Sequence, residues 1–443
     1  MSHAALTLTD AALEIREGRI TSAELVEDCL TRIAEADEKV QAWTFLDPAY
    51  ARAQAQALDE HRRHGRALGP LHGVPVGVKD IFDTADMPTE FGSPYWAGRT
   101  PRADAAAVTR LREAGAVIMG KTVTTEYAYF HPGKTRNPHN PERTPGGSSS
   151  GSAAAVATHM VPGAIGSQTN GSVIRPAAFC GVVGFKPTHG LIPRSGALEL
   201  SRTLDQVGVF TRSVEDAALM AQVLTGFDPE DPDTRARAQP HYVAVAGSEP
   251  PLPPRFAFAK TPLWEHADPT TREAFAELTE ALGGAATEVT LAAGFERARD
   301  MHKIVMEVEM AHNLGRDYDK IGAGLSEKLR SLIESGRTHS AVSYCTARAG
   351  IEPLNQALDE IFSAYDAILT PATPGEAPPA ETTGNPVFCS TWTYLGTPAV
   401  SLPLMASESG LPLGVQLVGR RGNDARLLRT ARWLVNTMQE QAR

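Results

Sequence analysis

Residues 145–176 read PGGSSSGSAAAVATHMVPGAIGSQTNGSVIRP, two Gly/Ser-rich loops separated by residues typical of packed structure. The first loop runs directly into Ala153–Thr158, whose small residues predict a helix in close contact with its neighbours. Val161–Gly166 then leads into the second loop. Glycine and asparagine reach backbone conformations that are closed to most residues, so such a loop can direct successive N–H groups at one point. The stretch therefore predicts ordered turns beside a packed core, because a flexible linker seldom adjoins such structure.

Short apolar runs alternate with helical patterns on both sides of this stretch. Val74–Val78 predicts a buried strand that ends at Lys79, and Ala103–Ala114 predicts a helix. Ala116–Met119 and Pro412–Gly419 predict further strands. This alternation favours an α/β fold around a largely buried sheet.

Capping residues and amphipathic patterns predict the remaining helices. Thr7 and Thr21 each precede an acidic residue by three positions, the form of a capping box at a helix start. The chain from Asp228 to Pro254 is rich in Pro, Asp and Glu and predicts a long surface connection. Further helices are predicted at 51–66, 271–282, 295–312, 324–335 and from about residue 424.

No clean boundary separates the first of these strands from the last, which favours one large domain over residues 1–443. We expect a core at about 60–220 and a variable segment on the substrate side at about 228–380. The C-terminal strand and helix are expected to return to the core.

Composition excludes several classes of protein. The formal net charge is −10 and no long basic run occurs, so a nucleic-acid partner is not expected. No apolar stretch approaches the roughly 20 residues that cross a bilayer, and the first ten residues lack the pattern of a signal peptide. We therefore expect a soluble cytoplasmic protein.

The four cysteines are far apart in the sequence and form no CxxC motif. Free buried thiols are favoured over a disulfide framework, which a chain with a large core does not need. The cysteines are Cys29, Cys180, Cys345 and Cys389.

Residues 115–122, GAVIMGKT, match the phosphate-binding pattern G-x-x-x-x-G-K-[ST] letter for letter. That loop must follow a strand and open a helix, but here a predicted helix precedes Gly115. The apolar residues inside the pattern are typical of a buried strand, and Gly115 is typical of a helix C-cap. We therefore interpret the match as fortuitous.

The two Gly/Ser-rich loops and Lys79 together carry a family resemblance. Lys79 ends a strand in HGVPVGVKD (72–80), Ser148 follows Gly146-Gly147, and Ser172 lies in the second loop. The blocks FCGVVGFKPT (179–188), GLIP (190–193), DQVG (205–208) and GTPAVSLP (396–403), with NPHN (137–140), accompany them in order. In these motifs and their spacing the chain resembles the amidase signature family.

The resemblance implies an α/β/α sandwich, in which helices cover both faces of a large, mixed, twisted β-sheet. It also implies a catalytic set in which Ser172 is the nucleophile, Ser148 the proton relay and Lys79 the base. A lysine with its ordinary pKa near 10.4 is a cation at neutral pH, so Lys79 must be buried or placed among dipoles to act as a base. The resemblance implies a cis peptide between Gly147 and Ser148, and neither a metal nor a cofactor.

The backbone N–H groups of the second loop are expected to form an oxyanion hole, which stabilises negative charge on the carbonyl oxygen. The donors are Thr169, Asn170, Gly171 and Ser172. Three serines of the first loop are instead expected to bind turn and helix-start N–H groups: Ser149, Ser150 and Ser152.

The second loop departs from the usual family sequence DTGGSIR. Gln168 replaces the acid, Asn170 replaces a glycine, and Ile174 stands where the arginine is expected. Acid and arginine are expected to pair in the family, so losing both leaves no stranded buried charge. Asn170 is expected to be tolerated if its backbone is left-handed.

The leading hypothesis is a hydrolase of a carboxamide, aryl amide or carbamate, a urethanase-like enzyme included. It would act on a small molecule as a monomer or homodimer. One alternative is the A-type subunit of an amidotransferase that acts on aminoacyl-tRNA with partner subunits, and another is a catalytically silent scaffold. Several residues are expected to contact the substrate, although core packing would explain them equally well. They are Tyr127, Tyr129, Phe130, Gly147, Met306 and Trp392.

Overall fold

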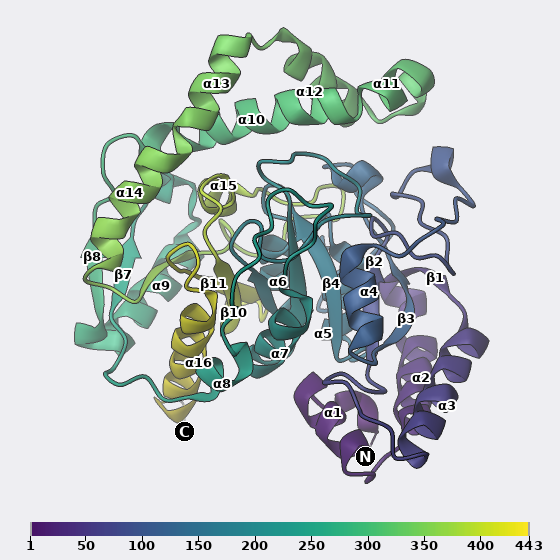
Figure 1. Ribbon diagram of the computed structural model, residues 1–443. Coiled ribbons are helices and arrows are strands. Elements are labelled where there is room, and N and C mark those ends of the chain that lie inside the picture. The colour runs from purple at the N-terminus through teal and green to yellow at the C-terminus, as the bar shows by residue number, and fades with distance from the viewer. Residues whose placement is uncertain (1, 442–443) are drawn as a thin grey trace.

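A computed structural model describes residues 2–441, and its centre is one mixed sheet of eleven strands. The strand order is β1-β3-β2-β4-β6-β5-β10-β11-β9-β7-β8. Helices cover both faces, so the expected α/β/α sandwich is confirmed (Figure 1). The strands are β1 (Trp43–Leu46), β2 (Pro75–Lys79), β3 (Val117–Thr122), β4 (Gly163–Gln168), β5 (Val183–Lys186), β6 (Gln206–Thr211), β7 (Phe256–Ala259), β8 (Ala286–Val289), β9 (Ala367–Pro371), β10 (Ala399–Ala406) and β11 (Pro412–Val418).

The parallel strands β3, β2 and β4 position the candidate site. Val78 of β2 is paired with Ile165 of β4, and Lys79 is paired with Thr122 of β3. All residues of β2 and β3 are buried, as their continuous apolar sequences predict. The carboxyl ends of β2 and β4 therefore meet at one edge of the sheet, the place where ligands bind in open α/β folds.

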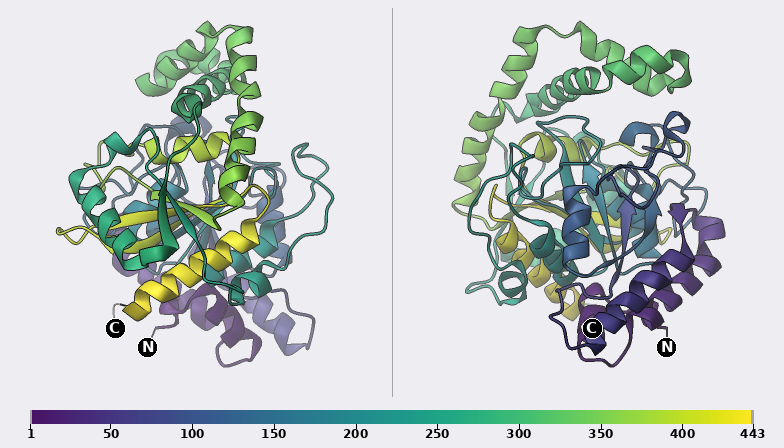
Figure 2. Two further views of the ribbon diagram at one scale, coloured as in Figure 1. Left: turned by 90° about the vertical axis from the view of Figure 1, so that its left-hand side faces the viewer. Right: turned by 45° about the vertical axis from the view of Figure 1, so that its right-hand side comes forward.

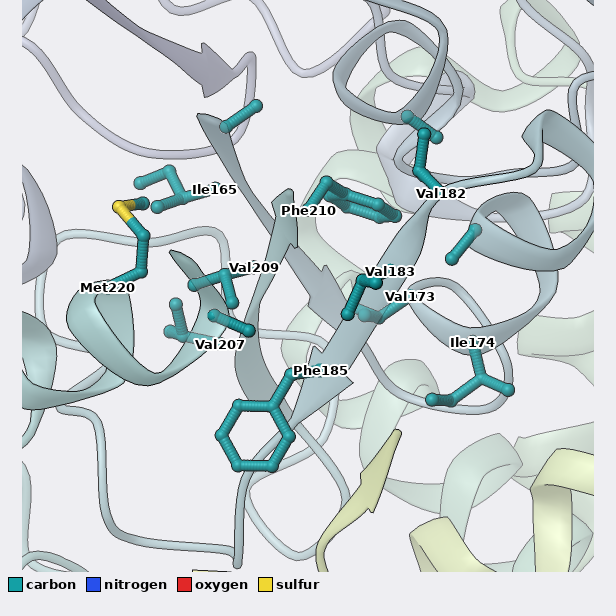
Figure 3. Packing of buried hydrophobic residues seen from close by; sticks show 14 of the residues in the cluster. Ile165, Val173, Ile174, Val182, Val183, Phe185, Val207, Val209, Phe210 and Met220 are labelled. Atoms are coloured by element: carbon teal, nitrogen blue, oxygen red, sulfur yellow. The ribbon is translucent and has the colours of Figure 1, made fainter. Parts of the chain in front are cut away.

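Alternating side chains of the central strands build two separate layers of core. Val209 of β6 lies on the same side as Met220 of helix α7 (Val214–Leu224), whereas Phe210 lies with Val173, at the start of helix α6 (Ile174–Cys180) (Figure 3). Since successive strand residues point to opposite faces, one apolar strand can hold a helix on each side.

Most of the predicted helices are present, with ends shifted by a few residues. The helices that the sequence patterns did not predict are α6, α7, α8, α11, α13, α14 and α15. The helices not bounded above are α1 (Leu8–Arg16), α2 (Ser22–Val40), α3 (Pro48–Arg63), α4 (Ala106–Glu113), α5 (Ser150–Ala157), α8 (Tyr242–Gly247), α9 (Pro269–Leu282), α10 (Ala298–Asn313), α11 (Gly315–Ile321), α12 (Glu327–Thr338), α13 (Ala341–Ala349), α14 (Ile351–Phe362), α15 (Val387–Tyr394) and α16 (Asp424–Gln441).

Helices α10–α14, residues 298–362, form a helical arm at one side of the sheet, away from the two ends of the chain (Figures 1 and 2). Helix α10 packs on α15, which follows the arm in sequence and lies near the sheet. The segment 228–380 also contributes β7, β8 and β9 to the sheet, which the sequence analysis did not predict. The surface connection expected at 228–254 is mostly without regular structure, but it contains α8.

The capping predictions at the N-terminus are confirmed. Thr7 accepts a hydrogen bond from the N–H of Asp10, and Thr21 and Glu24 form a complete capping box. The interpretation of residues 115–122 as a fortuitous match to the phosphate-binding pattern is also confirmed. Gly115 follows α4 with a φ of 84°, and the residues after it form the buried strand β3.

Four free cysteines are present, and three of them are buried as expected. Cys345 is exposed on α13, so the expectation of a buried thiol is wrong there. The prediction failed because the helical arm leaves part of its surface in solvent. None of the helices within residues 2–441 combines the length and the hydropathy of a bilayer-spanning segment.

Candidate active site

Lys79 lies at the carboxyl end of β2, fully buried, with its amine between two serines. Its Nζ is 2.6 Å from Ser148 Oγ and 2.8 Å from Ser167 Oγ. The pairing of β2 with β4 explains the second contact, because it sets Lys79 beside the last residues of β4. Ser148 is supplied separately by the loop that leads into α5.

Burial lowers the pKa of Lys79 well below its ordinary value. Asp205 acts in the opposite direction, since its negative charge raises the pKa of that amine. Asp205 is half-buried, and the loss of solvent around its carboxyl group raises its pKa to about 6. It accepts hydrogen bonds from Thr169 Oγ1 at 2.6 Å and from the N–H groups of Leu200 and Ser201. The amine therefore has the environment that a lysine base requires, two hydroxyl contacts in a desolvated place.

Within the first loop, Ser148 alone among the serines contacts Lys79. The peptide bond between Gly147 and Ser148 is cis, as the family resemblance implies. Ser149 Oγ is bonded to the backbone of Ser167, Ser150 Oγ donates to the carbonyl of Val123, and Ser152 Oγ donates to that of Ile165. These three hydroxyls therefore tie the loop and α5 to neighbouring strands and loops. The expectation that they bind N–H groups is wrong for Ser150 and Ser152, because both donate to carbonyl oxygens instead.

Ser172 lies in the loop between β4 and α6, with 8 % of its surface exposed. Among the described residues, no acceptor is hydrogen-bonded to the backbone N–H groups of residues 169–172. The next two N–H groups, of Val173 and Ile174, are occupied. Gly171 allows the loop to lie close to α15, because a Cβ there would meet the side chain of Pro386 at 2.8 Å. The loop thus holds a partly accessible serine beside unoccupied N–H donors.

Gln168 explains how the loop is held without the usual acid. Its Oε1 accepts hydrogen bonds from the N–H groups of Val173 at 2.8 Å and Ile174 at 3.0 Å. Its Nε2 donates to Thr393 Oγ1 at 2.9 Å. A neutral amide therefore organises the turn, and the buried Ile174 needs no ionic partner. The expectation that this loop holds no stranded buried charge is wrong, because the next residue, Arg175, is buried and pairs with no carboxylate among the described residues.

Replacing Gln168 by leucine is expected to destabilise the chain by about 3 kcal/mol, because two buried N–H groups lose their acceptor. The free energy of unfolding in urea measures this effect. The matched control is Gln439→Leu on the exposed side of α16, where a change of less than about 0.5 kcal/mol is expected. Equal effects of the two substitutions would contradict the role of Gln168.

Asn170 does not adopt the left-handed backbone under which the sequence analysis expected it to be tolerated. The residues other than glycine that have a positive φ within the described chain do not include Asn170. Instead its side-chain oxygen accepts a hydrogen bond from Ser390 Oγ, and its carbonyl accepts one from Thr393 Oγ1, both at 2.6 Å. Contacts with α15 thus hold this position in place of the conformational freedom of glycine.

Ser148 and Ser172 line one narrow pocket, with a cavity volume of about 20 Å³. The predicted substrate residues Tyr129, Phe130 and Met306 line the same pocket. The other lining residues are Ala128, Thr169, Asn170, Arg175, Leu200 and Met310.

The remaining predicted substrate residues lie elsewhere. Tyr127 is buried, and its hydroxyl donates to Asp317 and accepts from Trp96 Nε1. Trp392 is buried in the core on α15. Gly147 is buried and is not among the lining residues, although its carbonyl contacts one of them. In this region the aromatic character of a residue did not distinguish side chains that pack in the core, such as Tyr127 and Trp392, from those that line the pocket.

A second cavity, of about 360 Å³, adjoins the first one. The two share Thr169 and Leu200, and the larger cavity also reaches Ser167, the second hydroxyl partner of Lys79. Asp205 and Arg194 contribute polar groups to its wall. The Lys79–Ser167 contact therefore lies next to a larger cavity with both polar and apolar groups in its wall.

The sequence analysis missed several residues that contact the site. Ser167 directly precedes the departures from the family motif, which was a usable signal. No sequence signal pointed to His302. It reaches the site from α10, and its Nε2 is 2.9 Å from the carbonyl oxygen of Thr169. Burial lowers the pKa of His302 to about 4, so it is neutral at pH 7 and can donate this hydrogen bond. The helical arm thereby holds the loop that carries Ser172.

The fold and the lysine–serine arrangement define a class of enzyme that cleaves C–N bonds. A model of the amidase family matches residues 24–428, and the chain belongs to this family. The chain is 34% identical to the A-type subunit of glutamyl-tRNA(Gln) amidotransferase from Chloroflexus aggregans, over 96% of this chain and 94% of that protein. It is 33% identical to the putative amidase AmiD from Mycobacterium bovis, over 96% and 92%.

The solved structures that resemble this chain include the native peptide amidase from Stenotrophomonas maltophilia. The TM-score is 0.87 with 30% identity, and the alignment covers 99% of this chain and 98% of the amidase. The similarity therefore extends over both the sheet and the helical arm.

Proposed function

We propose that this chain hydrolyses a carboxamide, an aryl amide or a carbamate through an acyl-enzyme on Ser172. The observation that carries the proposal is the buried Lys79 amine, 2.6 Å from Ser148 Oγ, with Ser148 and Ser172 in one pocket. A serine hydroxyl is a weak nucleophile until a base removes its proton. Lys79, with its lowered pKa, is joined to this pocket through Ser148 and supplies that base.

In the proposed reaction, neutral Lys79 takes the proton of the Ser148 hydroxyl while Ser148 takes that of Ser172. Ser172 Oγ attacks the carbonyl carbon, and the negative charge on the oxygen is stabilised by the N–H groups of residues 169–172. The relay then returns a proton to the leaving amine as the C–N bond breaks. Water attacks the acyl-enzyme by the same relay and releases the acid.

A second candidate is the A-type subunit of an amidotransferase, favoured by the 34% identity to that component of glutamyl-tRNA(Gln) amidotransferase. It would use the same three residues with partner subunits. The net charge of −10 without a basic run supports the hydrolase instead, because a tRNA partner requires positive charge near its phosphates. The similarity to a peptide amidase and to a putative amidase also supports the hydrolase.

The purified chain, with no other protein present, tests the proposal on a panel of aryl amides, aliphatic amides and carbamates. Turnover of at least one class, together with labelling of Ser172 by a serine-reactive phosphonate, is the expected result. Absence of both would overturn the hydrolase. Amide transfer to glutamyl-tRNA only after partner subunits are added would favour the second candidate.

A further inference from the structure

Arg175 is a buried cation in the wall of the pocket that contains Ser148 and Ser172. Only 2 % of the surface of Arg175 is exposed to solvent. Its Nη2 donates to the carbonyl oxygen of Gly147 at 2.6 Å, whereas Nε and Nη1 have no hydrogen-bond partner among the described residues. A guanidinium carries five N–H donors, so most of the hydrogen-bonding capacity of Arg175 is unused.

No carboxylate balances this charge within the described part of the chain. Arg175 is the one charged residue among those that line the pocket. Burial lowers the pKa of Arg175 to about 10, which still leaves the side chain protonated at neutral pH. A buried cation without an anionic partner is costly, and its cost is relieved when an opposite charge binds in hydrogen-bonding geometry.

The surroundings of Arg175 favour a planar anion. The half-buried ring of Phe130 lies over the guanidinium, with 5.3 Å between the guanidinium carbon and the ring centre. Leu200, Met306 and Met310 add apolar surface to the same pocket. A guanidinium recognises a carboxylate through two parallel N–H···O bonds, a match that strengthens in a desolvated site.

We propose that Arg175 binds a carboxylate of the substrate, so that the preferred substrates are amides or carbamates with an anionic group close to the scissile bond. The inference rests on the proposed function, because it names the substrate class of the same pocket. The proposal requires the half-buried Phe130 side chain to rotate away from the guanidinium when this carboxylate binds. The hydrogen bond to Gly147 holds the guanidinium beside the loop that carries Ser148.

Matched substrate pairs test the inference. On the acyl side, the monoamides of malonic, succinic and glutaric acid are compared with the neutral diamides. On the amine side, N-acylglycines are compared with uncharged N-acylalkylamines of the same length. The carboxylate member of at least one pair is expected to have a kcat/KM about 10–100-fold higher, mostly through KM, since a charged hydrogen bond distinguishes the two. The side on which the preference occurs locates the anion.

Two variants separate binding of the anion from support of the loop. Arg175→Gln retains a donor for the Gly147 carbonyl but no charge, so the ratio of kcat/KM within the pair is expected to fall to about 1 whatever the absolute rate. Arg175→Lys is expected to retain part of the ratio. The matched control Arg421→Gln removes an exposed charge outside the pocket and should leave the ratio unchanged. A wild-type ratio near 1 in every pair, or an unchanged ratio in Arg175→Gln, overturns the inference.

Calorimetry distinguishes failure of this inference from failure of the proposed function. Titration of Ser172→Ala protein with succinamate and with succinamide measures binding without turnover, and tighter binding of succinamate is expected. If amides are hydrolysed but the carboxylate has no effect on kinetics or binding, the inference is wrong and the hydrolase stands. If nothing is hydrolysed and phosphonate does not label Ser172, the hydrolase is wrong, and the titration alone decides whether Arg175 binds the anion.

Discussion

Replacing Ser172 by alanine is expected to lower kcat/KM by roughly 10⁴-fold or more, because removal of a serine nucleophile eliminates the covalent route. The hydroxyl has no hydrogen-bond partner among the described residues, and its loop is held by Gln168 and α15. The substitution should therefore leave the fold unchanged. Hydrolysis of the best panel substrate measures the loss.

Two controls accompany this result. Ser150→Ala removes a neighbouring hydroxyl that bonds to the backbone of Val123 and does not line the pocket, so it should change kcat/KM far less. Thermal unfolding of both variants should match that of the wild type within a few degrees. Retention of most of the wild-type activity by Ser172→Ala would exclude Ser172 as the nucleophile.

Replacing Lys79 by methionine is expected to lower kcat/KM by about 10²–10⁴-fold, the range that a general base contributes. In the wild type, kcat/KM should decrease as the pH falls through the lowered pKa of Lys79, because the protonated amine cannot accept a proton from Ser148. Asp205→Asn removes the charge that raises this pKa, so it should move the decrease to lower pH. A pH–rate profile that is the same with and without Asp205 would contradict the assignment.

The same pKa shift predicts how stability depends on pH. The folded chain keeps Lys79 neutral at pH values where the unfolded chain, with a lysine pKa near 10.4, still binds the proton. The unfolded state then binds more protons, so the free energy of unfolding rises with pH between the folded and unfolded pKa values of Lys79. Lys79→Met lacks this contribution, so the free energy of unfolding of the wild type should rise relative to that of the variant from pH 7 to pH 9. That window lies above the pKa of Asp205, about 6, so the carboxyl group does not titrate in it.

Local patterns were sufficient to predict an α/β fold around a largely buried sheet. Val74–Val78 and residues 116–119 are continuous apolar runs, and only a strand with both faces covered accommodates such a run. The capping box at Thr21 predicted a helix start because its two hydrogen bonds join residues three positions apart. The strands β7–β9 were not predicted, since their short sequences have no period that distinguishes strand from helix.

Motifs contained in short segments were enough to establish the fold class and the family, and to single out Lys79, Ser148 and Ser172 as candidate site residues. The other residues that reach the pocket depend on long-range packing instead. The pairing of Val78 with Ile165 brings Ser167 to Lys79, and α10 brings His302 to the Ser172 loop across 133 positions. Arg175 became a pocket cation because burial removed its access to water and left it without a carboxylate, a property of the packed chain that no local pattern contains.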